Sequence, residues 1–172
     1  ISSYYVIALS EAASNLSRFD GIRYGLRKDP LASFDDLYVA TRSDGFGSEV
    51  KRRIVIGNYV LSTHFSGDTY RKAMSVRARI QRDVAAVFET HDILLCPTNP
   101  APAFPLGSRV DDPLAMYLTD LYTTFVNLAR IPSLSIPAGK TAAGLPVGVQ
   151  ICGPMGGEKT ILEVARAREK SR

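Results

Sequence analysis

Two central segments of the chain place apolar residues at every third or fourth position, the spacing of a helix that buries one face. The first spans roughly residues 49–64, and its apolar positions are Val50, Ile54, Val55, Tyr59 and Leu61. The second runs from Asp68 to about Glu89, with one face formed by Ala73, Val76, Ile80, Val84 and Val87. We expect Ser48 and Asp68 to be the N-cap residues, because short polar side chains accept hydrogen bonds from first-turn N–H groups.

Cap and turn signals predict the helices that come before these two. Residues 4–9 fit either a short strand or the entry to a helix, and helical spacing over 11–19 ends at the turn pair Asp20-Gly21. Ser33 is expected to cap a short helix that runs through Ala40.

Short apolar runs bounded by proline or glycine predict three strands, over residues 92–96, 132–137 and 147–151. The last two flank a Gly-Leu-Pro turn and are expected to form a hairpin. Asp112-Pro113 combines an N-cap with a proline at the first helical position, which predicts a helix that runs to about residue 129. A final helix is expected over residues 158–170.

Interleaved helices and strands indicate an α/β class, with a mixed sheet flanked by helices. Three strands are too few for a self-covering sheet, and the residues from Ile1 onward already have the pattern of interior structure. We therefore expect residues 1–172 to be part of a longer domain.

Composition narrows the class of protein without naming an activity. The chain has 172 residues, 45% of them hydrophobic, and 21 Lys and Arg against 17 Asp and Glu, a balance that excludes intrinsic disorder. Charge, proline or glycine interrupts every apolar stretch before the ~20 residues that a membrane span needs, so no membrane contact is expected. Cys96 and Cys152 fit no disulfide framework or Cys-x-x-Cys motif, which favours a reducing cytosol.

The sequence offers no convincing nucleophile and no metal-ligand spacing. Ser10, Ser14 and Ser17 lie on a helical segment without a neighbouring His or Lys, and His64 and His91 are expected at helix ends, as surface or capping residues. A basic stripe on the second long helix is expected to be a solvated face, with contact to tRNA phosphates or an acidic partner as the alternative. It consists of Arg71, Lys72, Arg79 and Arg82.

Two charged residues stand out by position. Arg53 ends a run of three cations on the first long helix, and Asp120 is expected in mid-helix among apolar residues. Two interpretations fit each residue. It could form a surface or structural ion pair, or it could be part of a ligand clamp. An Arg fork matches a carboxylate with two hydrogen bonds, and an Asp accepts hydrogen bonds from an ammonium group. Together the two could hold an α-amino acid, although spacing alone does not show that they meet.

Long ordered strings across nearly the whole chain resemble the A subunits of the tRNA-dependent amidotransferases, a family within the amidase signature superfamily. The strings are Tyr4-Tyr-Val-Ile-Ala-Leu-Ser-Glu-Ala-Ala-Ser-Asn-Leu-Ser-Arg-Phe-Asp-Gly-Ile-Arg-Tyr-Gly25, Arg42-Ser-Asp-Gly-Phe-Gly-Ser-Glu-Val-Lys-Arg-Arg-Ile54, Asp111-Asp-Pro-Leu-Ala-Met-Tyr117, Val126-Asn-Leu-Ala129 and Gly144-Leu-Pro-Val-Gly-Val-Gln150. The resemblance implies the amidase signature fold, of which residues 1–172 would be the C-terminal part.

The resemblance also implies an activity for the complete protein. Its Ser–cis-Ser–Lys triad would lie in a preceding part, so no catalytic residue is expected in this segment, which alone would be inactive. The complete protein would hydrolyse glutamine and pass ammonia to the B subunit, which amidates mischarged Glu-tRNA(Gln) or Asp-tRNA(Asn), while the C subunit bridges the two. ATP and magnesium are implied for the whole complex, none of them in this segment, and its location would be cytoplasmic.

By the same resemblance, three residues would line the glutamine pocket: Arg53 at the α-carboxylate, Asp120 at the α-ammonium and Tyr4 near the reacting amide. The sequence departs from the family at Asn99, Phe125 and Arg130, which stand where the family usually has alanine, proline and glycine. Arg130 puts the shape of the pocket in doubt. Two alternatives stay open: another amidase signature hydrolase with a different amide substrate, and a non-catalytic binding or scaffold domain.

Overall fold

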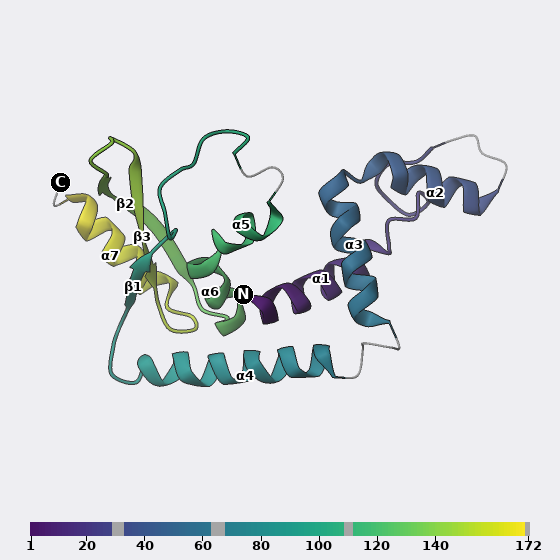
Figure 1. Ribbon diagram of the computed structural model, residues 1–172. Coiled ribbons are helices and arrows are strands. Elements are labelled where there is room, and N and C mark those ends of the chain that lie inside the picture. The colour runs from purple at the N-terminus through teal and green to yellow at the C-terminus, as the bar shows by residue number, and fades with distance from the viewer. Residues whose placement is uncertain (29–32, 63–67, 109–111, 171–172) are drawn as a thin grey trace. The chain divides into compact units, whose positions relative to one another are not determined.

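A computed structural model describes residues 1–28, 33–62, 68–108 and 112–170 of the chain (Figure 1). The chain divides into two compact units, Ser2–Met74 and Ser75–Arg172 with Ile1, here called the N-terminal and C-terminal units. The boundary falls inside helix α4 (Thr69–Val87). The α/β class is confirmed, because helices surround a small sheet in the second unit.

Three helices build the N-terminal unit: α1 (Ser2–Leu16), α2 (Phe34–Gly45) and α3 (Ser48–Leu61). The strand reading of residues 4–9 is wrong, since α1 already begins at Ser2. The cap predicted at Ser48 is also wrong. Gly47 occupies the N-cap position of α3 without a side-chain hydrogen bond, and Ser48 is the first helical residue.

The cap predicted at Ser33 is confirmed, because its side chain accepts a hydrogen bond from the N–H of Asp36 at 3.1 Å. Helix α2 runs further than expected, to Gly45. Arg42 in its last turn donates to the carbonyl oxygens of Leu16 and Phe19, at 2.8 and 3.2 Å. The first bond reaches the carbonyl of the last residue of α1, which has no partner within its own helix, and the second ties down the segment that follows.

Helices α1 and α3 pack closely where Gly57 of α3 meets α1. A Cβ atom at Gly57 would overlap the carbonyl oxygen of Leu9 and lie 2.7 Å from Cβ of Ala13. Glycine is the least favourable residue in a helix interior after proline, by about 1 kcal/mol relative to alanine. The close approach of the two helices explains why glycine stands there.

The C-terminal unit contains a three-stranded sheet in the order β1-β3-β2, formed by β1 (Leu94–Pro97), β2 (Ser133–Lys140) and β3 (Pro146–Cys152). Both strand pairs are antiparallel, with Ile151 of β3 opposite Leu95 on one side and Leu134 on the other. The predicted hairpin of β2 and β3 is confirmed. β2 extends to Lys140, past an irregularity in register between Pro137 and Gly139.

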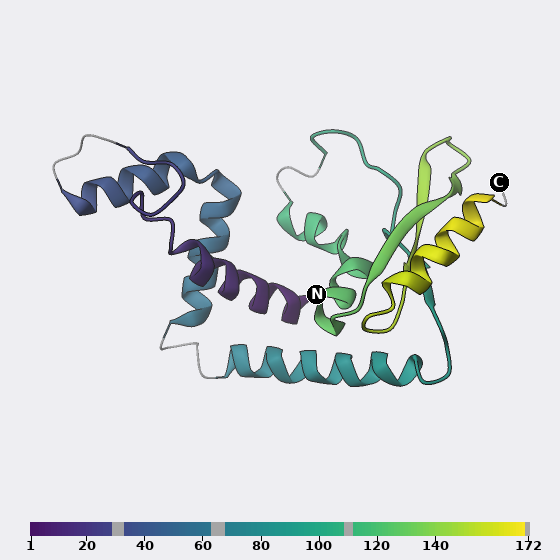
Figure 2. The same ribbon diagram turned by 180° about the vertical axis from the view of Figure 1, so that it is seen from behind.

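Helices lie on both sides of this sheet (Figures 1 and 2). Successive side chains along a strand point to opposite faces. Helix α7 (Glu158–Lys170), confirmed at its predicted bounds, packs Ile161 and Ala165 against Ile151 on one face. Gln150 points to the opposite face, where it bonds to helix α6 (Leu121–Ala129). The edge strand β1 is partly open to solvent, with Leu95 57% exposed.

The helix predicted from Asp112 to Ala129 is two helices. Asp112 caps the first, α5 (Pro113–Leu118), by accepting a hydrogen bond from the N–H of Ala115 at 2.9 Å, as predicted. Thr119 and Asp120 separate the two helices: Thr119 keeps right-handed helical dihedrals, whereas Asp120 departs from them before α6 begins at Leu121. The prediction of one continuous helix is therefore wrong.

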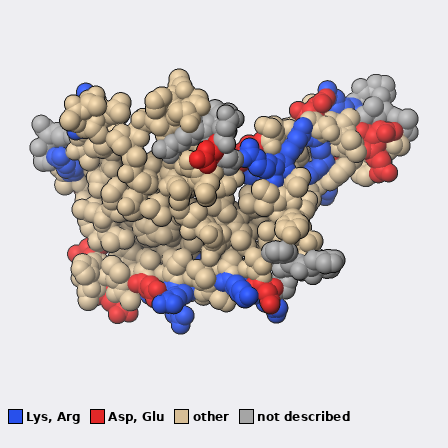
Figure 3. Space-filling model, in the orientation of Figure 1, with Lys and Arg blue, Asp and Glu red and all other residues tan. Residues whose placement is uncertain are grey.

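Helix α4 begins one residue after Asp68, whose carbonyl oxygen accepts the N–H of Lys72 at 2.8 Å. The four basic residues of the predicted stripe are exposed. Two of them pair with acidic neighbours, Arg71 with Asp68 at 3.0 Å and Arg79 with Asp83 at 3.6 Å. Blue and red side chains accordingly lie together along the lower edge in Figure 3. This arrangement supports the interpretation as a solvated face.

Arg130 ends α6 in a backbone conformation that usually belongs to glycine. Its φ is 60° and its ψ 43°, and it is the one non-glycine residue with positive φ in the part of the chain that the structure describes. The N–H groups of Arg130 and Ile131 both reach back to the carbonyl of Val126. This left-handed C-terminal cap is a common helix ending, and a side chain there adds strain.

We expect Gly57→Ala to destabilise the complete protein by about 1–3 kcal/mol, the usual cost of overpacking a tight contact. Asn58→Ala is the matched control, because Asn58 is the next residue of α3 and is exposed. Thermal unfolding of both variants checks this expectation. Equal midpoints for the two would contradict the close approach of α1 and α3.

We expect Arg130→Gly to stabilise the complete protein by about 0.5–1 kcal/mol, because glycine adopts positive φ without strain. Arg130→Ala is the control, since alanine removes the long side chain but keeps the Cβ that causes the strain. Urea unfolding midpoints should rise for the glycine variant alone. Stabilisation by both variants would assign the effect to the side chain and not to the backbone.

Candidate functional site

Asp120 lies at the junction of α5 and α6 and not in mid-helix as predicted. Its φ of −86° and ψ of 9° place it in the sparsely populated region between helix and strand, where turn and active-site residues are often found. Its N–H donates to the carbonyl of Tyr117, and its own carbonyl accepts the N–H groups of Thr123 and Thr124, at 3.1 and 3.0 Å. The backbone of Asp120 is thus tied to the first turn of α6.

The side chain of Asp120 does not serve the helix that follows it. Asp at an N-cap usually accepts a hydrogen bond from the second or third N–H of the helix. Asp120 holds the N-cap position of α6 but makes no side-chain cap hydrogen bond, whereas Asp112 makes one at α5. The two acids therefore differ, and only Asp112 is explained by capping.

Arg53 and its neighbour Arg52 share one carboxylate on α3. Nε of Arg53 donates to Oε1 of Glu49, and an Nη of Arg52 lies by Oε2 of Glu49, each at 3.0 Å. The side chains of Arg53 and Arg52 are 48% and 45% exposed. Glu49 thus orients two guanidinium groups in a solvated position, where ion pairs contribute about 0–1 kcal/mol to stability.

Tyr4 lies in the first half of α1 and is partly buried. Its ring meets that of Tyr5 edge to face, with ring centroids 5.3 Å apart. Tyr4 and Arg53 belong to the N-terminal unit, whereas Asp120 belongs to the C-terminal unit. The joint clamp of Arg53 and Asp120 therefore joins residues of two different units and stays a prediction.

The sequence did not predict a buried polar cluster around Gln150, which contacts α6 two residues after Asp120. Gln150 is 3% exposed, and its side-chain amide donates to the carbonyl of Tyr122 on α6 at 2.9 Å and to Sγ of Cys96 at 3.3 Å. Burial, with Cys96 close by, raises the pKa of the Cys152 thiol to about 12, so Cys152 is protonated and unreactive at neutral pH. The overlooked signal was a glutamine within the apolar strand at 147–151.

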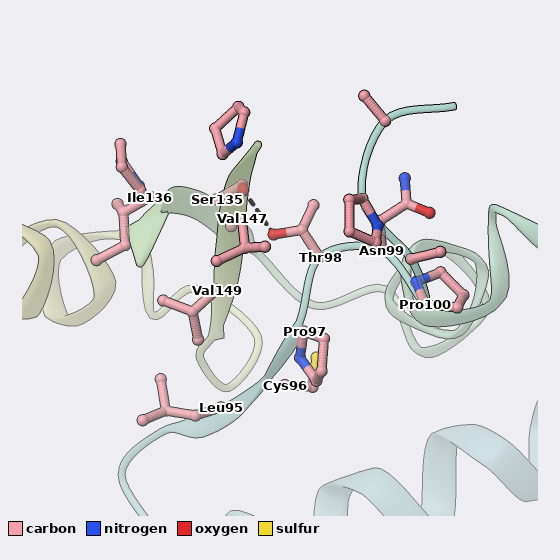
Figure 4. A pocket seen from close by; sticks show the side chains of 16 residues that line it. Leu95, Cys96, Pro97, Thr98, Asn99, Pro100, Ser135, Ile136, Val147 and Val149 are labelled. Carbon is pink, nitrogen blue, oxygen red and sulfur yellow. Dashed lines mark hydrogen bonds between the residues drawn. The ribbon is translucent and has the colours of Figure 1, made fainter. Parts of the chain in front are cut away.

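A hollow of about 960 Å³ lies between the proline-rich loop after β1 and the strands β2 and β3 (Figure 4). Thr98 and Ser135 point toward each other across its wall, with their hydroxyl oxygens 2.6 Å apart. Gly148 lies under this pair, and a Cβ there would come within 3.0 Å of both hydroxyl oxygens. Asn99 also lines the hollow, which contains no charged side chain among its lining residues.

Two of the three serines considered as nucleophiles, and the described histidine, make local contacts. Ser10 is 2% exposed and donates to the carbonyl of Val6 within α1, and Ser17 donates to that of Ser14. The surface or capping role expected for His91 is confirmed, because its exposed ring contacts Thr90 and the last carbonyl of α4, that of Val87. His64 lies outside the described residues.

Two kinds of feature are absent from the residues that the structure describes. No cluster of three or more His, Cys, Asp or Glu side chains there has an arrangement that could hold a metal ion. No helix there combines the length and the apolar character that crossing a membrane requires.

The α/β fold and the sequence strings together point to one class of protein. The model of the amidase family matches residues 1–162, and the chain therefore belongs to the amidase family. This confirms the resemblance drawn from the sequence.

Individual relatives and a solved structure show which proteins of this family the chain is similar to. The chain is 64% identical over 170 residues to the A subunit of glutamyl-tRNA(Gln) amidotransferase from Treponema denticola, a match that covers 99% of this chain and 35% of that protein. The A subunit from Lactococcus lactis is 54% identical over 169 residues, with 98% and 35% covered. The crystal structure of the A subunit from Thermotoga maritima aligns with a TM-score of 0.60 at 35% identity, covering 96% of this chain and 38% of that one. The chain thus spans about a third of the length of these relatives.

Proposed function

We propose that the complete protein is the glutaminase component of a tRNA-dependent amidotransferase, and that residues 1–172 supply the glutamine-recognition side of its pocket. The observation that carries this proposal is the 64% identity, across 99% of the chain, to a protein named as the A subunit of glutamyl-tRNA(Gln) amidotransferase. The Ser–cis-Ser–Lys triad that hydrolyses the amide would lie in the part of the protein outside these residues.

In this proposal Arg53 holds the α-carboxylate of glutamine. The planar guanidinium offers parallel N–H donors that match the two oxygens of a carboxylate. Nε of Arg53 donates to Glu49 at 3.0 Å, and this bond favours one orientation of the guanidinium group. Glu49 is thus a positioning residue for the clamp.

Asp120 holds the α-ammonium group in the same proposal. Its carboxylate makes no cap hydrogen bond to α6, so helix capping does not account for an acid at this junction. A carboxylate and an ammonium form charge-assisted hydrogen bonds, about twice as strong as neutral ones. Tyr4 lines the pocket near the reacting amide.

The other subunits, the tRNA and the cofactors of the complex follow from the proposal that the complete protein is its glutaminase component. Ammonia released from glutamine passes to the B subunit, which amidates mischarged tRNA, and the C subunit bridges the other two in a cytoplasmic heterotrimer. ATP and magnesium act in the activation of the tRNA-bound side chain and need no residue of this segment.

Asp120→Asn in the complete complex should lower kcat/KM for glutamine about 10- to 150-fold, because a charge-assisted hydrogen bond contributes about 1.5–3 kcal/mol. Amidation with ammonium chloride in place of glutamine should be unchanged. Asp83→Asn, which removes an exposed acid of α4, is the control. Equal losses with glutamine and ammonium chloride would indicate a folding defect and refute the role of Asp120.

Arg53→Lys should lower glutaminase kcat/KM by about 100-fold, because loss of the fork lets glutamine tilt by about 1 Å at the reacting amide. Arg52→Lys is a closely matched control, since both arginines bond to Glu49 at 3.0 Å and have similar exposure. Both variants should unfold at the wild-type temperature. Wild-type glutamine kinetics in Arg53→Lys would show that the clamp lies elsewhere, and a loss in Arg52→Lys would move it to Arg52.

A further inference from the structure

Gln150 is a buried amide whose two ends both have hydrogen-bond partners. Its Nε2 donates to the carbonyl of Tyr122 at 2.9 Å, and its Oε1 accepts a long bond from the Ser133 hydroxyl at 3.5 Å. An amide buried without partners costs about 1–3 kcal/mol. These contacts explain how Gln150 is tolerated in a strand next to Ile151, which is 1% exposed.

The bond from Gln150 reaches α6 at a particular place. Tyr122 is the second residue of α6 and lies two positions after Asp120. Because the carbonyl of Asp120 accepts the N–H groups of Thr123 and Thr124, the backbone of Asp120 moves with this turn. Gln150 therefore connects the central strand β3 to the turn that carries Asp120.

Helix α5, on the other side of Asp120, is poorly suited to hold it. Leu114 and Leu118 of α5 are 66% and 51% exposed, so this helix buries little apolar surface in the part of the chain described. Helix α6 buries Thr124, Val126, Leu128 and Ala129. The position of Asp120 is thus determined mainly from the α6 side.

The far end of α6 has a separate attachment. Nε2 of Gln81 on α4 donates to the carbonyl of Leu128 at 3.0 Å. Two glutamines therefore make the same kind of bond to the same helix, one beside Asp120 and one at the opposite end. This pair provides a control for the general effect of loosening α6.

We propose that Gln150 is a positioning residue for glutamine hydrolysis, which holds the first turn of α6 so that the Asp120 carboxylate meets the α-ammonium group of the substrate. This inference rests on the proposed function. The competing explanation is that Gln150 only stabilises the interior between β3 and α6.

The test uses the complete amidotransferase complex and compares Gln150→Met with Gln81→Met. Methionine keeps the length and unbranched shape of glutamine but cannot donate a hydrogen bond. In Gln150→Met we expect KM for glutamine to rise about tenfold, the size expected for one buried hydrogen bond, with kcat changed less. Amidation with ammonium chloride should be unchanged, and Gln81→Met should keep the wild-type KM. Equal KM changes in the two variants would overturn the proposal.

A double-mutant cycle with Asp120→Asn separates positioning from general stabilisation. If Gln150 acts through Asp120, adding Gln150→Met to Asp120→Asn should lower kcat/KM for glutamine less than about threefold further. Independent, multiplicative losses would overturn the proposal. If Gln150→Met does not assemble, Gln150→Asn replaces it, because its amide is one methylene too short to reach Tyr122.

The same measurements distinguish failure of this inference from failure of the proposed function. A complex with impaired glutamine use in Asp120→Asn but wild-type KM in Gln150→Met rejects only the role of Gln150. A complex in which Asp120→Asn also has wild-type glutamine kinetics rejects the role of Asp120, and the positioning role falls with it.

Discussion

The C-terminal unit depends on strand β3, which has hydrogen-bonded neighbours on both edges and helices on both faces. Alternation along the strand sends Ile151 toward α7 and Gln150 toward α6, so adjacent residues serve opposite layers. A shift of one residue in register would exchange the two side chains and bury an unpaired amide against α7. The polar contact of Gln150 and the apolar contact of Ile151 therefore specify the same register.

Sequence patterns predicted the helices best where a single local interaction determines where the helix begins. The caps at Ser33 and Asp112 are such cases, since the side chain and its N–H partner lie within one turn. The burial of apolar side chains was predicted less well. Only Ala73 on the predicted apolar face of α4 is buried, while Val76 and Val87 stay exposed in the described part of the chain.

Only part of the candidate site could be predicted from the sequence, because several of its contacts form only in the folded chain. Arg53 could be assigned to α3 because the helical pattern there is strong, but its bond to Glu49 also suits an ordinary surface ion pair. The break at Asp120 gave no proline or glycine signal. Residues 119 and 120 depart from the helix through backbone bonds to Met116 and Tyr117, three positions back, which composition does not reveal. The hydrogen bond from Gln150 to Tyr122 forms only when β3 and α6 come together.

Of the three residues noted as departures from the family pattern, Phe125 lies on α6 and Arg130 at its C-terminal cap, whereas Asn99 lines the hollow beside β1. Arg130 and Asp120 are the caps at opposite ends of a nine-residue helix, which separates them by about 15 Å along the axis. The left-handed cap at Arg130 satisfies the same end of α6 that Gln81 holds, whereas Gln150 holds the end beside Asp120. Strain at Arg130 is thus separated from Asp120 by a bonded helix with its own anchor. We therefore expect a bulky residue at that cap to lower the stability of the helix end more than it changes the position of the Asp120 carboxylate.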